Sequence, residues 1–222
     1  MNAYRHVLGW AFERLYREFA WTYDGVAWVV SRGLWRRWVL TVLPHVRGRV
    51  LELGSGPGHL QRALQQRSPG SAFGLDRSPF MIAQGARRLR RSGLPASLVR
   101  ASTQQLPLQS ASCDTVVATF PAEYIFDSRT HAEIRRVLAP DGRLVLVLGA
   151  ELLGGGLPER LIDLAYRLTL QRSTRPTAVD PPLPFMIAGM RLRALWESVG
   201  RSRVLLVIGE LEPLEDRDGA RP

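Results

Sequence analysis

A cluster of glycines between residues 54 and 58 has the residue types and spacing of a ligand-binding turn. The preceding residues, 50–53 (VLEL), form a short apolar stretch typical of a buried strand. Gly54 and Gly56 can adopt positive φ and place no side chain between the backbone and a ligand. A helical segment at 57–67 follows, and the N–H groups at its start can receive a polar ligand. The pattern therefore predicts a binding loop at the end of a strand.

An acidic residue, Asp76, ends the next apolar stretch, and it has the chemistry to complete a nucleoside site. A carboxylate at that place can accept hydrogen bonds from both ribose hydroxyls. The dinucleotide-binding pattern G-x-G-x-x-G would need a third glycine where this chain has His59. The glycines here run G-x-G-x-G instead. This spacing disfavours an NAD(P)-dependent Rossmann oxidoreductase, which stays the alternative enzyme class.

Strand-like and helix-like segments alternate through the middle of the chain, and this alternation predicts how the loop is positioned. Ser78 is expected to cap one of the helices, with Pro79 in its first turn. Residues 140–142 (PDG) are expected to form a turn. Alternation of this kind predicts a parallel sheet covered on both faces. Strands are expected over 49–53, 72–75, 96–100, 113–119 and 143–148, and helices over 57–67, 78–91 and 131–138.

The two ends of the chain complete the expected fold. Residues 190–197 and 203–210 are candidate last strands, and the short link between them predicts antiparallel pairing. We expect a single α/β domain with a doubly wound, mostly parallel seven-stranded Rossmann-like sheet and an antiparallel last strand. Its expected segments are an N-terminal helical cap (1–45, two helices), a binding core (46–150), a variable substrate segment (151–185, with a helix at 157–171 and a loop at 173–184), the last two strands (186–211) and a frayed tail (212–222).

The loop resembles motif I of the class I methyltransferases that depend on S-adenosylmethionine (SAM), and Asp76 stands where that family keeps its ribose-binding acid. The resemblance continues in chain order. Residues 106–108 (LPL) and 112–117 (SCDTVV) are similar to the family's LPF…FD-x-V stretch. Residues 131–147 are similar to its E-x-x-R-V-L-x-P-G-G segment. The match spans residues 46–150 and is nearest to the group that methylates ubiquinone and menaquinone precursors, which includes many small-molecule enzymes.

This resemblance implies SAM as the cofactor and assigns residues to its parts. Asp76 would hold the ribose, Arg77 and Met81 would lie near the adenine, and residues 120–123, beginning with Phe120, would flank the methyl group. Relatives commonly place an acid before the LP segment to meet the adenine amine, whereas this chain has Ser102 there. The amino-acid and sulfonium end of SAM would be surrounded by Glu52, Gly54, Ser55, Gly56 and Gly58.

The catalytic residue is left open among several candidates. Methyl transfer from a sulfonium depends mainly on alignment, and a base matters when the acceptor is a hydroxyl or an acidic carbon. Glu123 and Tyr124 follow the fourth strand, at the sheet edge where ligands bind. Tyr23 belongs to a Tyr-Asp element that is similar to one in these relatives. His131 is expected to be a cap or surface residue.

Charge and composition restrict the partners. The net charge is +10, and all basic residues are arginines. Because the arginine clusters fall on separate predicted helices without interleaved aromatics, we expect a solvated surface and no specific nucleic-acid partner. The one cysteine, Cys113, is expected in the core, so no disulfide, Cys-based zinc cage or other metal site is predicted. The sequence shows neither an apolar membrane span nor a secretory signal, which favours the cytoplasm.

Tryptophans recur in the N-terminal segment at helical spacing. Trp21, Trp28 and Trp35 are seven residues apart, and Trp38 follows. One interpretation is a helix packed on the sheet domain. The other is a lipophilic pocket or a peripheral membrane contact, with nearby arginines at anionic headgroups. We expect a SAM-dependent enzyme acting on a small, largely apolar molecule, with a non-catalytic SAM-binding module as the further alternative.

Overall fold

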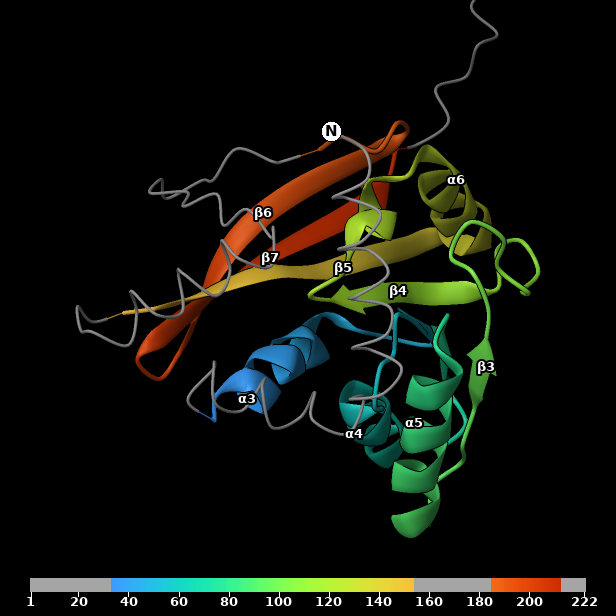
Figure 1. The fold of residues 1–222 in the computed structure, drawn as a ribbon. Coiled ribbons are helices and arrows are strands. Elements are labelled where there is room, and N and C mark those ends of the chain that lie inside the picture. The colour runs from blue at the N-terminus through green and yellow to red at the C-terminus, as the bar shows by residue number, and fades with distance from the viewer. Residues whose placement is uncertain (1–32, 154–184, 213–222) are drawn as a thin grey trace, which may run out of the picture.

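A seven-stranded sheet organises the molecule. The computed structural model describes residues 33–153 and 185–212, coloured in Figure 1. The spatial order of the strands is β3-β2-β1-β4-β5-β7-β6. Their bounds are β1 Val50–Leu53, β2 Ala72–Asp76, β3 Leu98–Arg100, β4 Cys113–Thr119, β5 Leu138–Leu152, β6 Met190–Val199 and β7 Ser202–Leu211.

The strand directions confirm the doubly wound, mostly parallel fold. The pairs β3–β2, β2–β1, β1–β4 and β4–β5 are parallel. Strand β7 runs antiparallel to both of its neighbours, β5 and β6, as expected for the last strand. The order of the strands reverses between β1 and β4. In open sheets of this kind ligands bind at such a switch point, outside the carboxyl ends of the strands.

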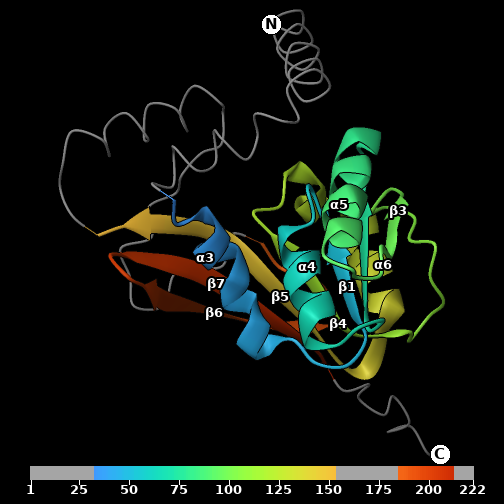
Figure 2. The same cartoon turned by 90° about the horizontal axis from the view of Figure 1, so that it is seen from below.

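Helices cover both faces of this sheet. The first face carries α3, α4 and α5, and α6 lies on the other (Figures 1 and 2). Ser78 caps α5 as expected, since its Oγ accepts from the backbone N–H of Met81 at 3.4 Å. Asp127 caps α6 by accepting from Arg129 N–H at 2.9 Å. The helices are α3 Trp35–Val39, α4 His59–Arg67, α5 Pro79–Arg91 and α6 Ser128–Val137, with 3-10 helices η1 Leu40–His45 and η2 Glu123–Phe126.

Each face of the sheet has its own apolar core. On the α3/α4 face, Trp38 and Leu60 pack with Val145 and Val147 of β5. On the α6 face, Ile134 joins a cluster from the central strands. The side chains of β1 are buried along the whole strand, as burial on both faces requires. This double burial fixes the carboxyl end of β1, from which the glycine loop begins.

The fifth strand differs most from the expected elements. It begins at Leu138, which pairs with Cys113, and the next pair joins Arg143 to Thr115. The expected turn at 140–142 is therefore an irregularity inside β5, because the chain remains beside β4 while the extra residues loop out. The expected helix at 157–171, the loop at 173–184 and most of the segment 1–45 lie outside the described residues.

Candidate functional site

The glycine loop has the expected backbone conformation. Gly54, Gly56 and Gly58 have φ values of 67°, 50° and 79°. In this left-handed region side chains are unfavourable. A Cβ built on Gly56 would have no heavy atom within 4 Å, so this residue borders open space. The loop can therefore admit a ligand next to its backbone.

A second close approach, not anticipated from the sequence, holds the loop against α5. A Cβ on Gly58 would lie 3.0 Å from the Cα of Gly85, in the middle of α5. A Cβ on Gly85 would lie 2.8 Å from a methyl carbon of Leu98. Glycine in a helix interior is unfavourable by about 1 kcal/mol relative to alanine. A glycine at position 85, inside a predicted helix, was therefore an indication in the sequence that another segment packs closely there.

Asp76 lies at the carboxyl end of β2 and contacts the loop directly. Its Oδ2 accepts from Gly56 N–H at 2.9 Å, and its Oδ1 accepts from Ser78 N–H at 2.8 Å. Burial raises the pKa of this carboxyl, against the lowering effect of these two hydrogen bonds. An ionised carboxylate has about four acceptor positions. Asp76 can thus support the loop and still accept hydrogen bonds from a ligand.

Glu52 and Ser55 present buried polar atoms to the same loop. Glu52 is 2% exposed, and neither its Oε2 nor the Oγ of Ser55 has a hydrogen-bond partner among the described residues. Burial raises the pKa of Glu52 to about 8; a hydrogen bond from the Gln61 side chain opposes this rise and the charge of Asp76 adds to it. Buried polar atoms without partners are costly. These atoms therefore fit a ligand with complementary polar groups, such as the ammonium group of SAM.

Tyr124 reaches the glycine loop from the opposite side of the switch point. Its hydroxyl donates to the carbonyl oxygen of Leu53 at 3.0 Å. A Cβ on Gly54 would lie 2.7 Å from that hydroxyl oxygen. Glu123, its neighbour in η2, is exposed. Of the three candidate catalytic residues, the structure brings Tyr124 to the loop, leaves Glu123 in solvent, and does not describe Tyr23.

Phe120 occupies a strained position where β4 ends. Its φ is 48°, unusual for a residue with a side chain. Its N–H donates to the Val147 carbonyl at 2.8 Å, and its ring stacks on Trp35 with centroids 4.3 Å apart. Trp38 is buried nearby, and its indole N–H donates to Ser202 Oγ at 2.8 Å. Backbone strain of this kind concentrates at functional sites.

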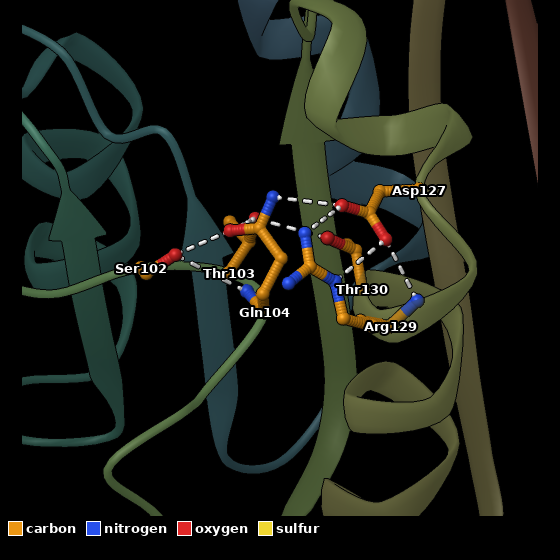
Figure 3. A network of polar contacts seen from close by, with 6 residues as sticks. All are labelled: Ser102, Thr103, Gln104, Asp127, Arg129 and Thr130. Atoms are coloured by element: carbon orange, nitrogen blue, oxygen red, sulfur yellow. Dashed lines mark hydrogen bonds and ion pairs between the residues drawn. The ribbon is translucent and has the colours of Figure 1, made fainter.

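The residues that the family resemblance assigns to the adenine lie along the β2–α5 junction and the loop after β3. Met81 is buried at the start of α5, and Arg77 is exposed. Ser102 is also exposed and its hydroxyl contacts the Gln104 side chain (Figure 3). Gln104 in turn donates to Asp127 at 3.2 Å. The position of the missing acid is therefore linked through Gln104 to the residue that caps α6.

The side chains of His131, Cys113 and its neighbour Asp114 are held by contacts within the protein. His131 is half-buried, with Nε2 2.6 Å from the Ile125 carbonyl oxygen and its ring stacked on Phe185. Cys113 is buried, as expected, and burial raises the pKa of its thiol. Asp114 accepts from Arg49 N–H at 2.7 Å. These contacts account for the three side chains without a ligand.

Comparison with known proteins agrees with this geometry. A family model described as "Methyltransferase domain" matches residues 50–142. A demethylmenaquinone methyltransferase from Thermus thermophilus is 32% identical over 164 residues, covering 71% of this chain and 72% of the relative. Another from Deinococcus radiodurans is 30% identical over 63% of this chain and 60% of its own length.

A solved structure shares the fold at low sequence identity. It is a SAM-dependent methyltransferase from Thermotoga maritima, described as a possible histamine N-methyltransferase. It superposes with a TM-score of 0.57 at 16% identity, covering 89% of this chain and 98% of that one. The switch-point site, the glycine loop and these matches together define a methyl-transferring enzyme. The chain belongs to the class I SAM-dependent methyltransferases that act on small molecules.

Proposed function

We propose that the enzyme transfers the methyl group of SAM to a small lipophilic acceptor that contains a planar ring. The observation that carries this proposal is the stacked pair Trp35–Phe120 at the carboxyl end of β4, next to the glycine loop at the switch point. Aromatic faces favour flat apolar molecules. The relatives from Thermus thermophilus and Deinococcus radiodurans are named for demethylmenaquinone, a ring compound of this kind.

The assignment of cofactor contacts rests on the polar atoms around the loop. Glu52 and Ser55 offer buried, unpartnered oxygens to the amino-acid end. Asp76 offers the remaining acceptor positions of its carboxylate to the ribose. Bound SAM would supply an electrophilic methyl on a positively charged sulfur. The full proposed contact set is Glu52, Gly54, Ser55, Gly56, Gly58, Asp76, Arg77, Met81, Ser102 and Phe120.

The protein's own contribution to the reaction is chiefly alignment and exclusion of water. The hydroxyl of Tyr124 lies against Gly54 and donates to the Leu53 carbonyl. Phe120 is fixed by its backbone hydrogen bond and its ring contacts. Holding reactants in line can supply several kcal/mol of the barrier reduction, roughly 7–11 in favourable cases. Among the candidate bases we favour Tyr124, because its phenol is the one in contact with the loop. Glu123 and Tyr23 remain candidates.

The segments around this core complete the proposal. We assign acceptor binding to the N-terminal segment 1–45 together with the variable segment 151–185, which precede and follow the core 46–150 in the sequence. Membrane contact through the N-terminal tryptophans stays a prediction for residues 1–32, because Trp35 and Trp38 turn inward. The described residues include no helix of the length and apolarity that a membrane span needs. A cytoplasmic location and the absence of a specific nucleic-acid partner remain predictions from the sequence.

The test combines binding and turnover. Isothermal titration should show saturable binding of SAM and S-adenosylhomocysteine, and none of NADH. Methyl transfer from labelled SAM is then measured over a panel of naphthoquinols, phenols and aliphatic amines. Turnover confined to the ring compounds supports the proposal. Turnover of amines alone would refute the acceptor class, and SAM binding without any turnover over the full panel would favour a non-catalytic module.

A further inference from the structure

A groove with basic walls runs along the outer face of α5, at the β3 edge of the sheet, away from the switch point. Its volume is about 550 Å³. Ile82, Ala83 and Ala86 contribute apolar surface. Arg87, Arg90, Arg91 and Arg100, all exposed, also line it. We call this surface the arginine groove.

The described segment that forms the arginine groove contains no acid that could balance its charge. Residues 77–113 contain six arginines and no aspartate or glutamate. Within the described residues, no ion pair engages any arginine of the groove. Asp76, before this stretch, points to the glycine loop, and Asp114, after it, binds Arg49. The groove therefore presents concentrated positive charge to solvent.

The apolar part of α5 continues beside the groove. Phe80, in the first turn, is 47% exposed. Phe80, Ala83, Arg87 and Arg91 follow one another at spacings of three and four residues, so they share one stripe of the helix. The stripe starts with an aromatic ring and ends with cations. Helices that rest in the interface of anionic membranes combine these same groups.

We propose that the arginine groove docks the enzyme onto an anionic phospholipid surface. Guanidinium groups form paired hydrogen bonds with phosphate, and the apolar wall with Phe80 matches the glycerol and upper acyl region. A nucleic acid would use the cations and could stack a base on Phe80, but it would leave the aliphatic wall of Ile82, Ala83 and Ala86 without a partner. The proposal concerns a surface distinct from the catalytic site, and it holds whether or not the acceptor is a quinone.

The test is flotation of the full chain with vesicles at ~150 mM salt, a concentration that suppresses long-range attraction. One set of vesicles is phosphatidylcholine alone, and the other contains about 25% phosphatidylglycerol. The double variant Arg87→Gln/Arg91→Gln is compared with Arg191→Gln/Arg193→Gln on β6, the opposite edge of the sheet. Both variants lose the same charge, and both replace exposed arginines.

The expected result is binding to the anionic vesicles alone. Each basic group near such a surface changes the partition by about fivefold, so the α5 variant should bind at least about tenfold more weakly. The β6 variant should bind like the wild type, and Phe80→Ser should weaken binding at unchanged charge. SAM affinity and thermal melting, measured in parallel, should be unchanged in all three.

Three outcomes would overturn the proposal. The first is the absence of binding to anionic vesicles. The second is an equal loss in the two double variants, which would indicate net charge rather than this groove. The third is saturable RNA binding at the same salt that depends on Arg87 and Arg91, whether or not Phe80→Ser weakens it. None of these outcomes bears on methyl transfer to a soluble acceptor, so the proposed function is tested separately.

Discussion

Replacement of Glu52 by glutamine is expected to stabilise the ligand-free protein and to weaken its binding of SAM. The pKa of Glu52 is raised from 4.5 to about 8, chiefly by burial. Between these values the folded protein binds more protons than the unfolded chain, so the wild type loses stability as the pH rises. Integrating this linkage gives a loss of up to about 3 kcal/mol between pH ~5 and pH ~8. Glu52→Gln removes this dependence.

Thermal melting of both proteins across this pH range measures the difference. A chain of this length shifts its melting temperature by about 2–4 °C per kcal/mol. The variant should therefore melt roughly 10 °C above the wild type at pH ~8 and nearly with it at pH ~5. A gap that does not change with pH would refute the reasoning, because the stabilisation would then come from packing alone.

A matched control makes the same Glu→Gln change at Glu133, a carboxyl whose pKa is lowered rather than raised. Hydrogen bonds from Arg136 are the main cause that lowers the pKa of Glu133. Its contribution to stability is present above its unfolded pKa and is lost as the pH falls. Glu133→Gln should therefore destabilise the protein at neutral pH and approach the wild type in acid.

Cofactor binding gives an independent view of Glu52. A positively charged ligand binds the ionised carboxylate more tightly than the neutral acid. As the pH rises toward the pKa of Glu52, the SAM affinity of the wild type should therefore rise by up to about tenfold per pH unit. Titrations between pH ~5.5 and ~7.5 avoid the α-amino group of SAM, which titrates near pH ~8. Glu52→Gln should bind more weakly and with little pH dependence. An equal pH slope in the two proteins would show that Glu52 does not face the cation.

Three further substitutions test the site. Asp76→Ala should lower SAM affinity roughly ten- to a hundredfold by titration, because charged hydrogen bonds contribute about 1.5–3 kcal/mol; Asp76→Asn keeps one acceptor oxygen and should lose less, so equal losses would contradict the ribose assignment. Gly56→Val strains the loop locally at φ 50°, but its Cβ meets open space, so it should keep the circular dichroism spectrum and abolish SAM binding; retained binding would place the cofactor elsewhere. Phe120→Gly relieves the strain at φ 48° and should melt no lower than Phe120→Leu. Both variants should lose turnover of ring acceptors and should lose less SAM affinity than Asp76→Ala; unchanged turnover in both would remove Phe120 from the acceptor site.

Local signals predicted much of the fold from the sequence. The strand at 113–119 has the bounds expected from its valines and threonines, since β-branched side chains suit a strand buried on both faces. The helix that ends at Arg91 has the expected bounds, and its start is marked by Ser78 as the cap and by Pro79 in the first turn. The left-handed glycines were foreseeable because few other residues tolerate that conformation. In these cases neighbouring residues alone decide the structure.

Contacts between distant segments were not predictable in the same way. The proline and glycine at 140–142 indicated a turn, but pairing with β4 keeps them within β5. The stacking of Trp35 on Phe120 joins residues far apart in the chain, and no local pattern specifies it. Asp76 was expected to bind a ligand, and its hydrogen bonds to the loop became visible only in three dimensions. Candidate residues could therefore be named from the sequence, but their partners could not.

The place of β7 in the sheet has a consequence for the order of events during synthesis. This strand comes last in the described chain yet lies between β5 and β6. Ser202, at its start, accepts the indole N–H of Trp38, 164 residues earlier. A nascent chain that has emerged only as far as β5 leaves the edge of β5 unpaired and Trp38 without this partner. We expect the native sheet to close only after residue 211 has left the ribosome, which would make the release of the C-terminal hairpin the step that commits the molecule to its fold.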